Sequence, residues 1–253
     1  MNTYKTSEVA KCIGIHPNTV RLYEELELIP KPMRKENGYR VFTDFHIEQI
    51  KFARIALRVE VLQNGLRKQA IAIIKTAALG DFDRAIFQAQ HYLQQISNER
   101  RNAEEAIVIT EKLFLGDYKE TASIYLNRKE VADYLQVSIN ALRNWELNGL
   151  ITIKRKQNGY RVYDEEDIRR LKIIRSLRCA NYSLSAILRM LNTISRNPGA
   201  DIRQVIDTPK EDDDIISVCD KLLTSLKYAE QNAKAMIDHL EKMKKQFEEN
   251  PPF

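Results

Sequence analysis

The side chains best suited to metal and redox chemistry are too scattered in this 253-residue chain to form a site. The three cysteines (Cys12, Cys179 and Cys219) stand far apart with no C-x-x-C pair, so neither a disulfide framework nor a thiolate metal site is expected. None of the four histidines belongs to an H-E-x-x-H pattern. The eight glycines form neither of the common loops that cradle nucleotide phosphates. The sequence therefore predicts no enzyme, no metal site and no cofactor.

Charge divides the chain into alternating blocks. Residues 1–76 carry 13 Lys and Arg against 8 Asp and Glu, and residues 123–197 carry 14 against 7. Residues 77–122 and 198–253 are acidic, with 5 against 8 and 8 against 12. This alternation is what two nucleic-acid-facing modules separated by non-contacting elements would show. No apolar run reaches the roughly 20 residues of a membrane helix and residues 1–11 lack a signal-peptide core, so we expect a cytoplasmic protein without membrane contact.

An internal repeat underlies the two basic blocks. Residues 8–57 align with residues 130–178 at an offset of 122, which falls to 121 after one deletion, and about eighteen positions are identical. The longest shared run, Asn-Gly-Tyr-Arg-Val, occupies residues 37–41 and 158–162. The chain therefore contains a duplicated domain. The expected divisions are a first domain at 1–76, a helix and linker at 77–122, a second domain at 123–197, and a linker and C-terminal helix at 198–253.

Each copy has the pattern of two short helices joined by a tight turn. In the second copy Asn127 and Glu130 form a capping box before the first helix, and Ser138 is a good N-cap for the second helix. In the first copy Pro17 fits the first position of the second helix. Apolar periodicity places Cys12 on the buried side of the first helix. Two such helices predict a helix-turn-helix in each copy.

A small β-wing and a third helix follow in each copy. The Asn-Gly pairs at 37–38 and 158–159 are strong signals for a hairpin turn. Each pair leads into a strand-like run that begins Tyr-Arg-Val. A third helix is expected to start near Thr43 in the first copy and near Asp164 in the second.

These runs give the repeat a specific resemblance. S-E-V-A, P-N-T-V-R-L-Y-E and E-N-G-Y-R-V-F in the first copy, and K-E-V-A, S-I-N-A-L-R-N-W-E and Q-N-G-Y-R-V-Y in the second, resemble the winged-helix DNA-binding domain of the MerR family of bacterial transcription regulators. Together the copies cover about 140 of the 253 residues. The family usually carries one such domain and dimerises, whereas this chain carries two. The first copy also has His16 where Ser or Thr is usual.

The resemblance implies that the second helix of each copy enters the major groove of double-stranded DNA while the wing straddles the backbone. Arginine can donate two hydrogen bonds to guanine or phosphate, asparagine can read adenine, and wing cations grip the backbone. The residues that would face DNA are His16, Asn18, Thr19, Arg21, Tyr23, Arg34, Lys35, Tyr39 and Arg40 in the first copy, and Ser138, Asn140, Arg143, Trp145, Arg155, Lys156, Tyr160 and Arg161 in the second.

Several of these residues also have structural alternatives, because a residue in the motif can serve the fold instead of DNA. The alternatives are that Arg21 and Arg143 pair with Glu24 and Glu146, that Tyr39 and Tyr160 brace the wings, and that Trp145 fills the core.

Both acidic segments contain an apolar seam with steps of three and four residues, which is typical of a coiled coil. One seam comprises Phe82, Ile86, Ala89, Leu93, Ile96, Arg100, Ala103, Ile107, Thr110 and Phe114, and the other comprises Ile215, Cys219, Leu222, Leu226, Ala229, Ala233, Met236, Leu240, Met243 and Phe247. We expect a mainly α protein in which these two helices form an antiparallel coiled coil, with Ile96 over Ala233 and Ala89 over Leu240.

MerR-like proteins dimerise through such a helix pair, so two helices in one chain imply a single-chain pseudodimer. It would bind a non-palindromic site and distort the duplex, with RNA polymerase at a promoter as a further partner. In the rival assembly the same seams pair between two chains and form a homodimer with four winged helices. Two other functions stay open: an architectural or excisionase-like DNA-binding factor, and a scaffold whose coiled coil binds another protein.

Overall fold

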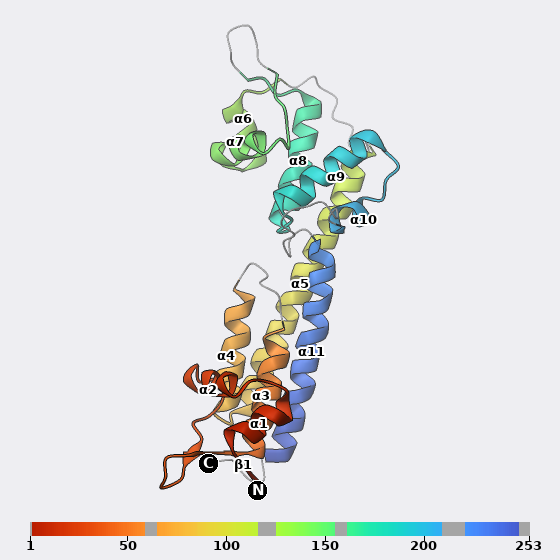
Figure 1. Cartoon of the computed structure of the whole chain (residues 1–253). Helices are drawn as coiled ribbons and strands as arrows, with labels where there is room; N and C mark the ends of the chain where they lie inside the picture. Colours follow the sequence, from red (N-terminus) through yellow and green to blue (C-terminus); the bar gives the residue numbers. More distant parts are fainter. Residues whose placement is uncertain (1, 59–64, 116–124, 155–160, 209–220, 248–253) are drawn as a thin grey trace. The chain divides into compact units, whose positions relative to one another are not determined.

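A computed structural model describes residues 2–58, 65–115, 125–154, 161–208 and 221–247 (Figure 1). The described residues are mainly helical, and the named strands are short and lie near the N-terminus. The chain divides into two compact units: residues 1–97 with 226–253 form unit 1, and residues 98–225 form unit 2. Each unit contains one copy of the sequence repeat. No described helix combines the length and the apolar character needed to cross a membrane.

Unit 1 contains the first helix-turn-helix. Its elements are β1 (Thr3–Tyr4), α1 (Thr6–Ile13), α2 (Pro17–Glu25), β2 (Met33–Arg34), β3 (Arg40–Thr43), α3 (Asp44–Ala56), α4 (Leu66–Ala78), the start of α5 (Phe82–Phe114) and most of α11 (Leu222–Phe247). Pro17 is the first residue of α2, as predicted, and the Nδ1 atom of His16 caps this helix by accepting from the backbone N–H of Asn18 at 3.2 Å.

The core of this module corrects one expectation. Val9 and Ala10 of α1 are buried against Val20 of α2 and Phe42 of β3. Cys12 is exposed, so its predicted burial is wrong. The reason is helical geometry: Cys12 lies two residues beyond Ala10, which turns its side chain away from the face that Val9 and Ala10 share.

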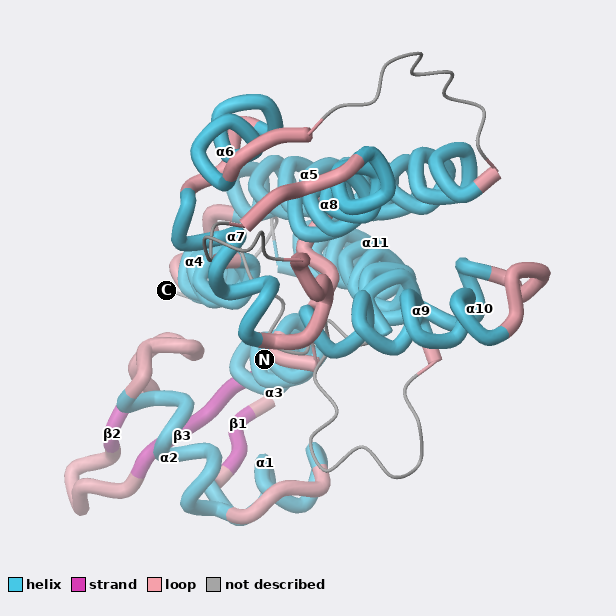
Figure 2. The backbone as a smooth tube through the Cα atoms, turned by 90° about the horizontal axis from the view of Figure 1, so that it is seen from above, coloured by secondary structure: helices cyan, strands magenta, loops and turns pink. Residues whose placement is uncertain are grey.

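The wing forms around a central strand. Figure 2 shows β3 between β1 and β2, and both pairings are antiparallel, with Tyr4 opposite Phe42 and Arg34 opposite Arg40. The predicted turn is confirmed: Gly38 has a φ of 79°, which favours glycine, and its N–H donates to the carbonyl of Lys35 at 2.8 Å. The sequence does not predict β1.

In unit 1, α11 contacts both α3 and α5. Asn232 of α11 donates to the carbonyl of Ile55 in α3 at 2.9 Å. Two polar contacts join α11 to α5, and they run antiparallel along the helices. They are Lys244 to Asp83 at 2.6 Å and Ser97 to Glu230 at 2.5 Å.

The burial along the two long helices tests the predicted seams. Every described seam position of α11 is buried: Leu222, Leu226, Ala229, Ala233, Met236, Leu240, Met243 and Phe247. In α5 the prediction holds at Phe82, Ala89, Ile96, Ala103, Ile107 and Thr110. Ile86, Leu93 and Arg100 are half-buried, and the prediction is wrong at Phe114, which is exposed.

The error in α5 has a simple cause. Apolar residues stand next to each other at 85–86, 92–93 and 113–114, so the sequence is compatible with two seams that differ by one residue. The fold buries the first member of each pair, namely Ala85, Tyr92 and Leu113. Coiled-coil packing of the two helices remains a prediction, as does their exact register.

Unit 2 contains the second helix-turn-helix. Its elements include α6 (Arg128–Leu135), α7 (Ile139–Leu147), α8 (Glu165–Cys179), α9 (Leu184–Arg196) and α10 (Ile202–Asp207). The predicted caps are confirmed: Asn127 and Glu130 form a capping box, and the Ser138 hydroxyl accepts from the N–H of Ala141 at 3.0 Å. The third helix of this copy, α8, starts where it was predicted, and Asp164 caps it. The predicted hairpin at 158–159 lies outside the described residues. Leu126 forms an antiparallel bridge with Tyr163, the counterpart of Tyr4 and Phe42 in unit 1.

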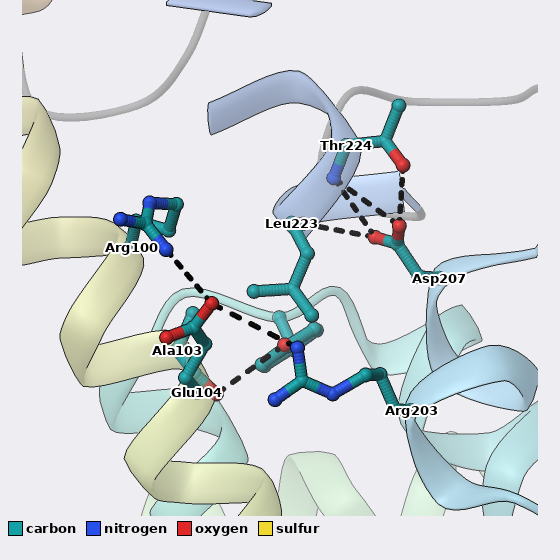
Figure 3. Close-up of polar contacts among 8 residues, drawn as sticks. Arg100, Ala103, Glu104, Arg203, Asp207, Leu223 and Thr224 are labelled. Atoms are coloured by element: carbon teal, nitrogen blue, oxygen red, sulfur yellow. Dashed lines mark hydrogen bonds and ion pairs between the residues drawn. The ribbon is translucent and has the colours of Figure 1, made fainter. Parts of the chain in front are cut away.

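Polar side chains connect α10 to the two long helices within unit 2 (Figure 3). Glu104 of α5 accepts a hydrogen bond from Arg100 at 2.9 Å and lies 3.8 Å from a guanidinium nitrogen of Arg203 in α10. Asp207, the last residue of α10, accepts from the backbone N–H of Leu223 at 2.8 Å and from the hydroxyl of Thr224 at 2.6 Å. Asp207 therefore caps the first turn of α11.

Candidate nucleic-acid interface

The second helix of each copy presents an asparagine and an arginine to solvent. Asn18 and Arg21 are exposed on α2, and the Arg21 guanidinium donates to the side-chain oxygen of Asn18 at 3.0 Å. Asn140 and Arg143 occupy the equivalent exposed positions on α7. Within the described part of the chain, Arg143 has no ion-pair partner. Both arginines are therefore placed where an incoming base edge or phosphate could reach them.

In the first copy a glutamate of α2 holds the wing. The carboxylate of Glu24 accepts from Arg40 of β3 at 2.5 Å and lies 3.8 Å from Arg34 of β2. The side chains of Glu24 and Arg40 are 12% and 25% exposed, whereas that of Arg34 is 54% exposed. The pair of Glu24 and Arg40 is therefore partly shielded from solvent, and it fixes the wing strand β3 against α2.

The second copy repeats this arrangement with a different third partner. The carboxylate of Glu146 on α7 accepts from Arg161, with contacts of 2.8–2.9 Å, and from Arg128 of α6 at 2.6 Å. The first copy has Thr6 where the second has Arg128. The acid and the wing arginine are thus shared by both copies, and the second acid carries two short ion pairs.

These pairs change the interpretation of four residues. The alternative that Arg21 and Arg143 pair with Glu24 and Glu146 is not what the structure shows, because the wing arginines hold these acids instead. Arg40 and Arg161, predicted to face DNA, are half-buried, and each is held by a carboxylate. Any contact that they make with DNA remains a prediction.

An open groove of about 850 Å³ lies between α1, α2 and the wing of unit 1. Four predicted residues line it: Arg21, Lys35, Tyr39 and Arg40. The other side of the groove, which the sequence does not predict, comprises Thr3, Tyr4, Lys5, Thr6, Ser7 and Glu8. Four cationic side chains and several hydroxyl groups face one hollow, a composition suited to a phosphate backbone.

The remaining predicted residues are divided between surface and core. His16, Lys35 and Ser138 are exposed, and Tyr39 is 71% exposed, so Tyr39 does not brace the wing by burial. Thr19 is half-buried. Arg155, Lys156 and Tyr160 lie outside the described residues.

Two aromatic residues lean toward the core. Trp145 is only 5% exposed, which favours its alternative role as a core residue. Tyr23 is half-buried against the core of the first module, and this burial raises the pKa of its hydroxyl. Contact of either residue with DNA remains a prediction.

The acidic anchors and the N-terminal side of the groove have weak sequence signals. Glu24 and Glu146 are identical in the two copies, which marks them, but their partners lie 10 or more residues away. Among the described residues, no cluster of three His, Cys, Asp or Glu side chains could hold a metal ion.

Comparison with known proteins finds a family match for each copy. Residues 127–194 match the family model for the MerR HTH family regulatory protein, and residues 5–42 match that for the MerR family regulatory protein. The chain is 43% identical over 53 residues to the HTH-type transcriptional regulator CueR of Escherichia coli O157:H7, an alignment that covers 21% of this chain and 39% of the relative.

Two further relatives show a similar extent of likeness. Identity is 29% over 65 residues with the HTH-type transcriptional regulator ZntR of Escherichia coli K12, covering 26% of this chain and 46% of the relative. It is 35% over 51 residues with the mercuric resistance operon regulatory protein of Bacillus cereus, covering 20% and 39%. The chain thus spans less than half the length of these relatives. No solved structure matches the chain.

Proposed function

From the premise that residues 5–42 and 127–194 are two MerR-type regions, we propose that this chain is a sequence-specific transcription regulator that binds double-stranded DNA through both of them. MerR-type proteins are DNA-binding regulators and not enzymes. The curated relatives support this class of function, because their names describe transcriptional regulators.

One observation carries the proposal: the same reading geometry occurs twice. Each copy exposes an asparagine and an arginine three residues apart on its second helix. Each copy also holds its wing arginine with a glutamate of its second helix: Glu24 holds Arg40, and Glu146 holds Arg161. We call the second helix of each copy, α2 or α7, its reading helix. When the wing is fixed beside this helix, cations of the wing can contact the DNA backbone while the helix contacts base edges.

We further propose that a single chain supplies both winged helices that contact one DNA site, and so acts as a pseudodimer. The antiparallel contacts Lys244 to Asp83 and Ser97 to Glu230 support this idea, because they join the two long helices within a single chain. The predicted consequence is a site with two unlike halves. Distortion of the duplex and contact with RNA polymerase at a promoter belong to the same proposal.

Selection from a pool of random DNA duplexes tests the function. The full chain should enrich one site, and its affinity should fall steeply with salt because several cations meet phosphates. Arg143→Ala should relax base choice in one half of that site, at a cost of roughly 1–3 kcal/mol if the arginine reads a base.

The matched control is Arg101→Ala, which removes an exposed arginine from α5 and should leave base choice unchanged. The absence of any enriched site, together with weak binding that hardly responds to salt, would contradict the proposal and favour a scaffold. An enriched site located in recombination arms would favour the architectural alternative.

A further inference from the structure

The outward stripe of each reading helix can be defined from exposure. Asn18, Arg21, Leu22 and Glu25 are all exposed on α2, with the spacing of one helical face. The buried Val20 and the half-buried Tyr23 lie on the other side of this helix, against the core. The stripe is therefore the surface that α2 offers to a partner.

The equivalent stripe of α7 is also exposed, and it comprises Asn140, Arg143, Asn144 and Leu147. Leu142 and Trp145 form the buried side of this helix. Because the offset between the copies is 122 here, the stripes can be compared position by position. They agree at the asparagine and the arginine, and they differ at the other two positions.

The first of the two differences, Leu22 against Asn144, places an apolar and a polar side chain at the same position of the stripe. Leu22 is 47% exposed and has only an apolar side chain to offer. Asn144, its counterpart, has a carboxamide that can donate and accept, and its side-chain oxygen accepts from Asn148 at 2.9 Å. Asn148 also donates to the backbone carbonyl of Asn144 at 2.8 Å, so the Asn144 carboxamide is held near the helix surface.

Base edges in the major groove distinguish these two side chains. An apolar side chain favours the methyl group of thymine, whereas a carboxamide can accept from N6 and donate to N7 of adenine. A leucine opposite adenine would leave both polar groups of the base without partners. We propose that residues 22 and 144 determine the specificity of the two half-sites, with Leu22 selecting thymine and Asn144 selecting adenine. This inference rests on the proposed function.

Reciprocal exchange of the two residues tests the inference. Site selection is repeated with the full chain carrying Leu22→Asn or Asn144→Leu. Leu22→Asn should change one base of one half-site from thymine to adenine, and Asn144→Leu should make the opposite change in the other half-site. Competition between duplexes that differ at that base should show a reversal of preference by about 5- to 150-fold, the range expected for one specific base contact.

Matched controls separate base reading from general surface effects. Leu79→Asn changes a leucine that is 78% exposed, and Asn102→Leu changes an exposed asparagine of α5; neither should alter base choice. Leu22→Ala and Asn144→Ala should weaken the preference at the same bases, and they provide a second measurement if an exchanged variant folds poorly.

The outcomes distinguish this inference from the function on which it rests. If the wild-type chain enriches no site, the proposed function fails and the inference fails with it. If the wild-type chain enriches a site but the exchanged and alanine variants keep its base preferences at every position, only the assignment of residues 22 and 144 is overturned.

Discussion

Replacement of Glu146 with glutamine should measure how strongly the wing is held. The carboxylate accepts from Arg128 and Arg161, and the three side chains are only 21–24% exposed. Glutamine keeps the size but removes the charge, leaving two guanidinium groups close together without a carboxylate. Breaking a fully buried ion pair costs about 3–5 kcal/mol and an exposed pair contributes about 0.2–1 kcal/mol. For this partly shielded site we expect the free energy of unfolding to fall by about 2 kcal/mol.

Urea unfolding followed by tryptophan fluorescence is the suitable assay. Trp145 is the only tryptophan of the chain, it is 5% exposed, and it precedes Glu146 on α7. With a slope of about 2 kcal/mol per molar urea, the unfolding midpoint of Glu146→Gln should fall by about 1 M.

A double-mutant cycle isolates the wing contact from other effects of the substitution. Arg161→Met alone should cost only about 1 kcal/mol, because Arg128 still neutralises Glu146. The double variant should then cost about 1 kcal/mol less than the sum of the two single variants. Strict additivity, or a midpoint for Glu146→Gln within about 0.2 M of the wild type, would refute the reasoning.

Three further predictions concern single residues. Lys35→Ala, at an exposed wing cation, should flatten the slope of log affinity against log salt by about one; an unchanged slope would show that Lys35 does not meet phosphate. Burial lowers the pKa of His46 from 6.5 to about 4, so the folded state favours the neutral ring and stability should fall, by about 3 kcal/mol at most, as pH drops from 6.5 to about 4. The free energy of unfolding, measured by urea at each pH, should depend less on pH in His46→Gln than in the wild type. The same pH dependence in both proteins would contradict this. Gln136 has a φ of 51°, and its counterpart Gly14 has a φ of 73°. Gln136→Gly should therefore raise the free energy of unfolding by about 0.5–1 kcal/mol, seen as a higher urea midpoint of the Trp145 fluorescence signal. A lower midpoint would count against backbone strain at Gln136.

The elements with local signals could be predicted from the sequence. Asn127 and Ser138 mark helix starts through hydrogen bonds to backbone only two or three residues away. Gly38 marks the wing turn because the required φ is positive. In these cases the physical cause lies within a few residues, so the sequence contains it.

The features missed by sequence analysis depend on distant partners. β1 has two residues and exists only because it pairs with β3, about 40 residues further along the chain. Glu24 has an arginine three residues before it and another sixteen residues after it, and only the folded wing brings Arg40 to the acid. The buried side of α5 was ambiguous because neighbouring apolar residues, such as Tyr92 and Leu93, offer two seams and only tertiary packing chooses between them.

The number of chains on one binding site tests the central claim most directly. The full chain is mixed with a duplex that carries a single copy of its enriched site, and the mass of the complex is measured by native mass spectrometry. If one chain supplies both winged helices that contact the site, the complex should contain one protein chain of 29.5 kDa for each duplex, bound to two unlike half-sites. A complex that forms only with two chains for each duplex would contradict the single-chain account and favour the homodimer with four winged helices.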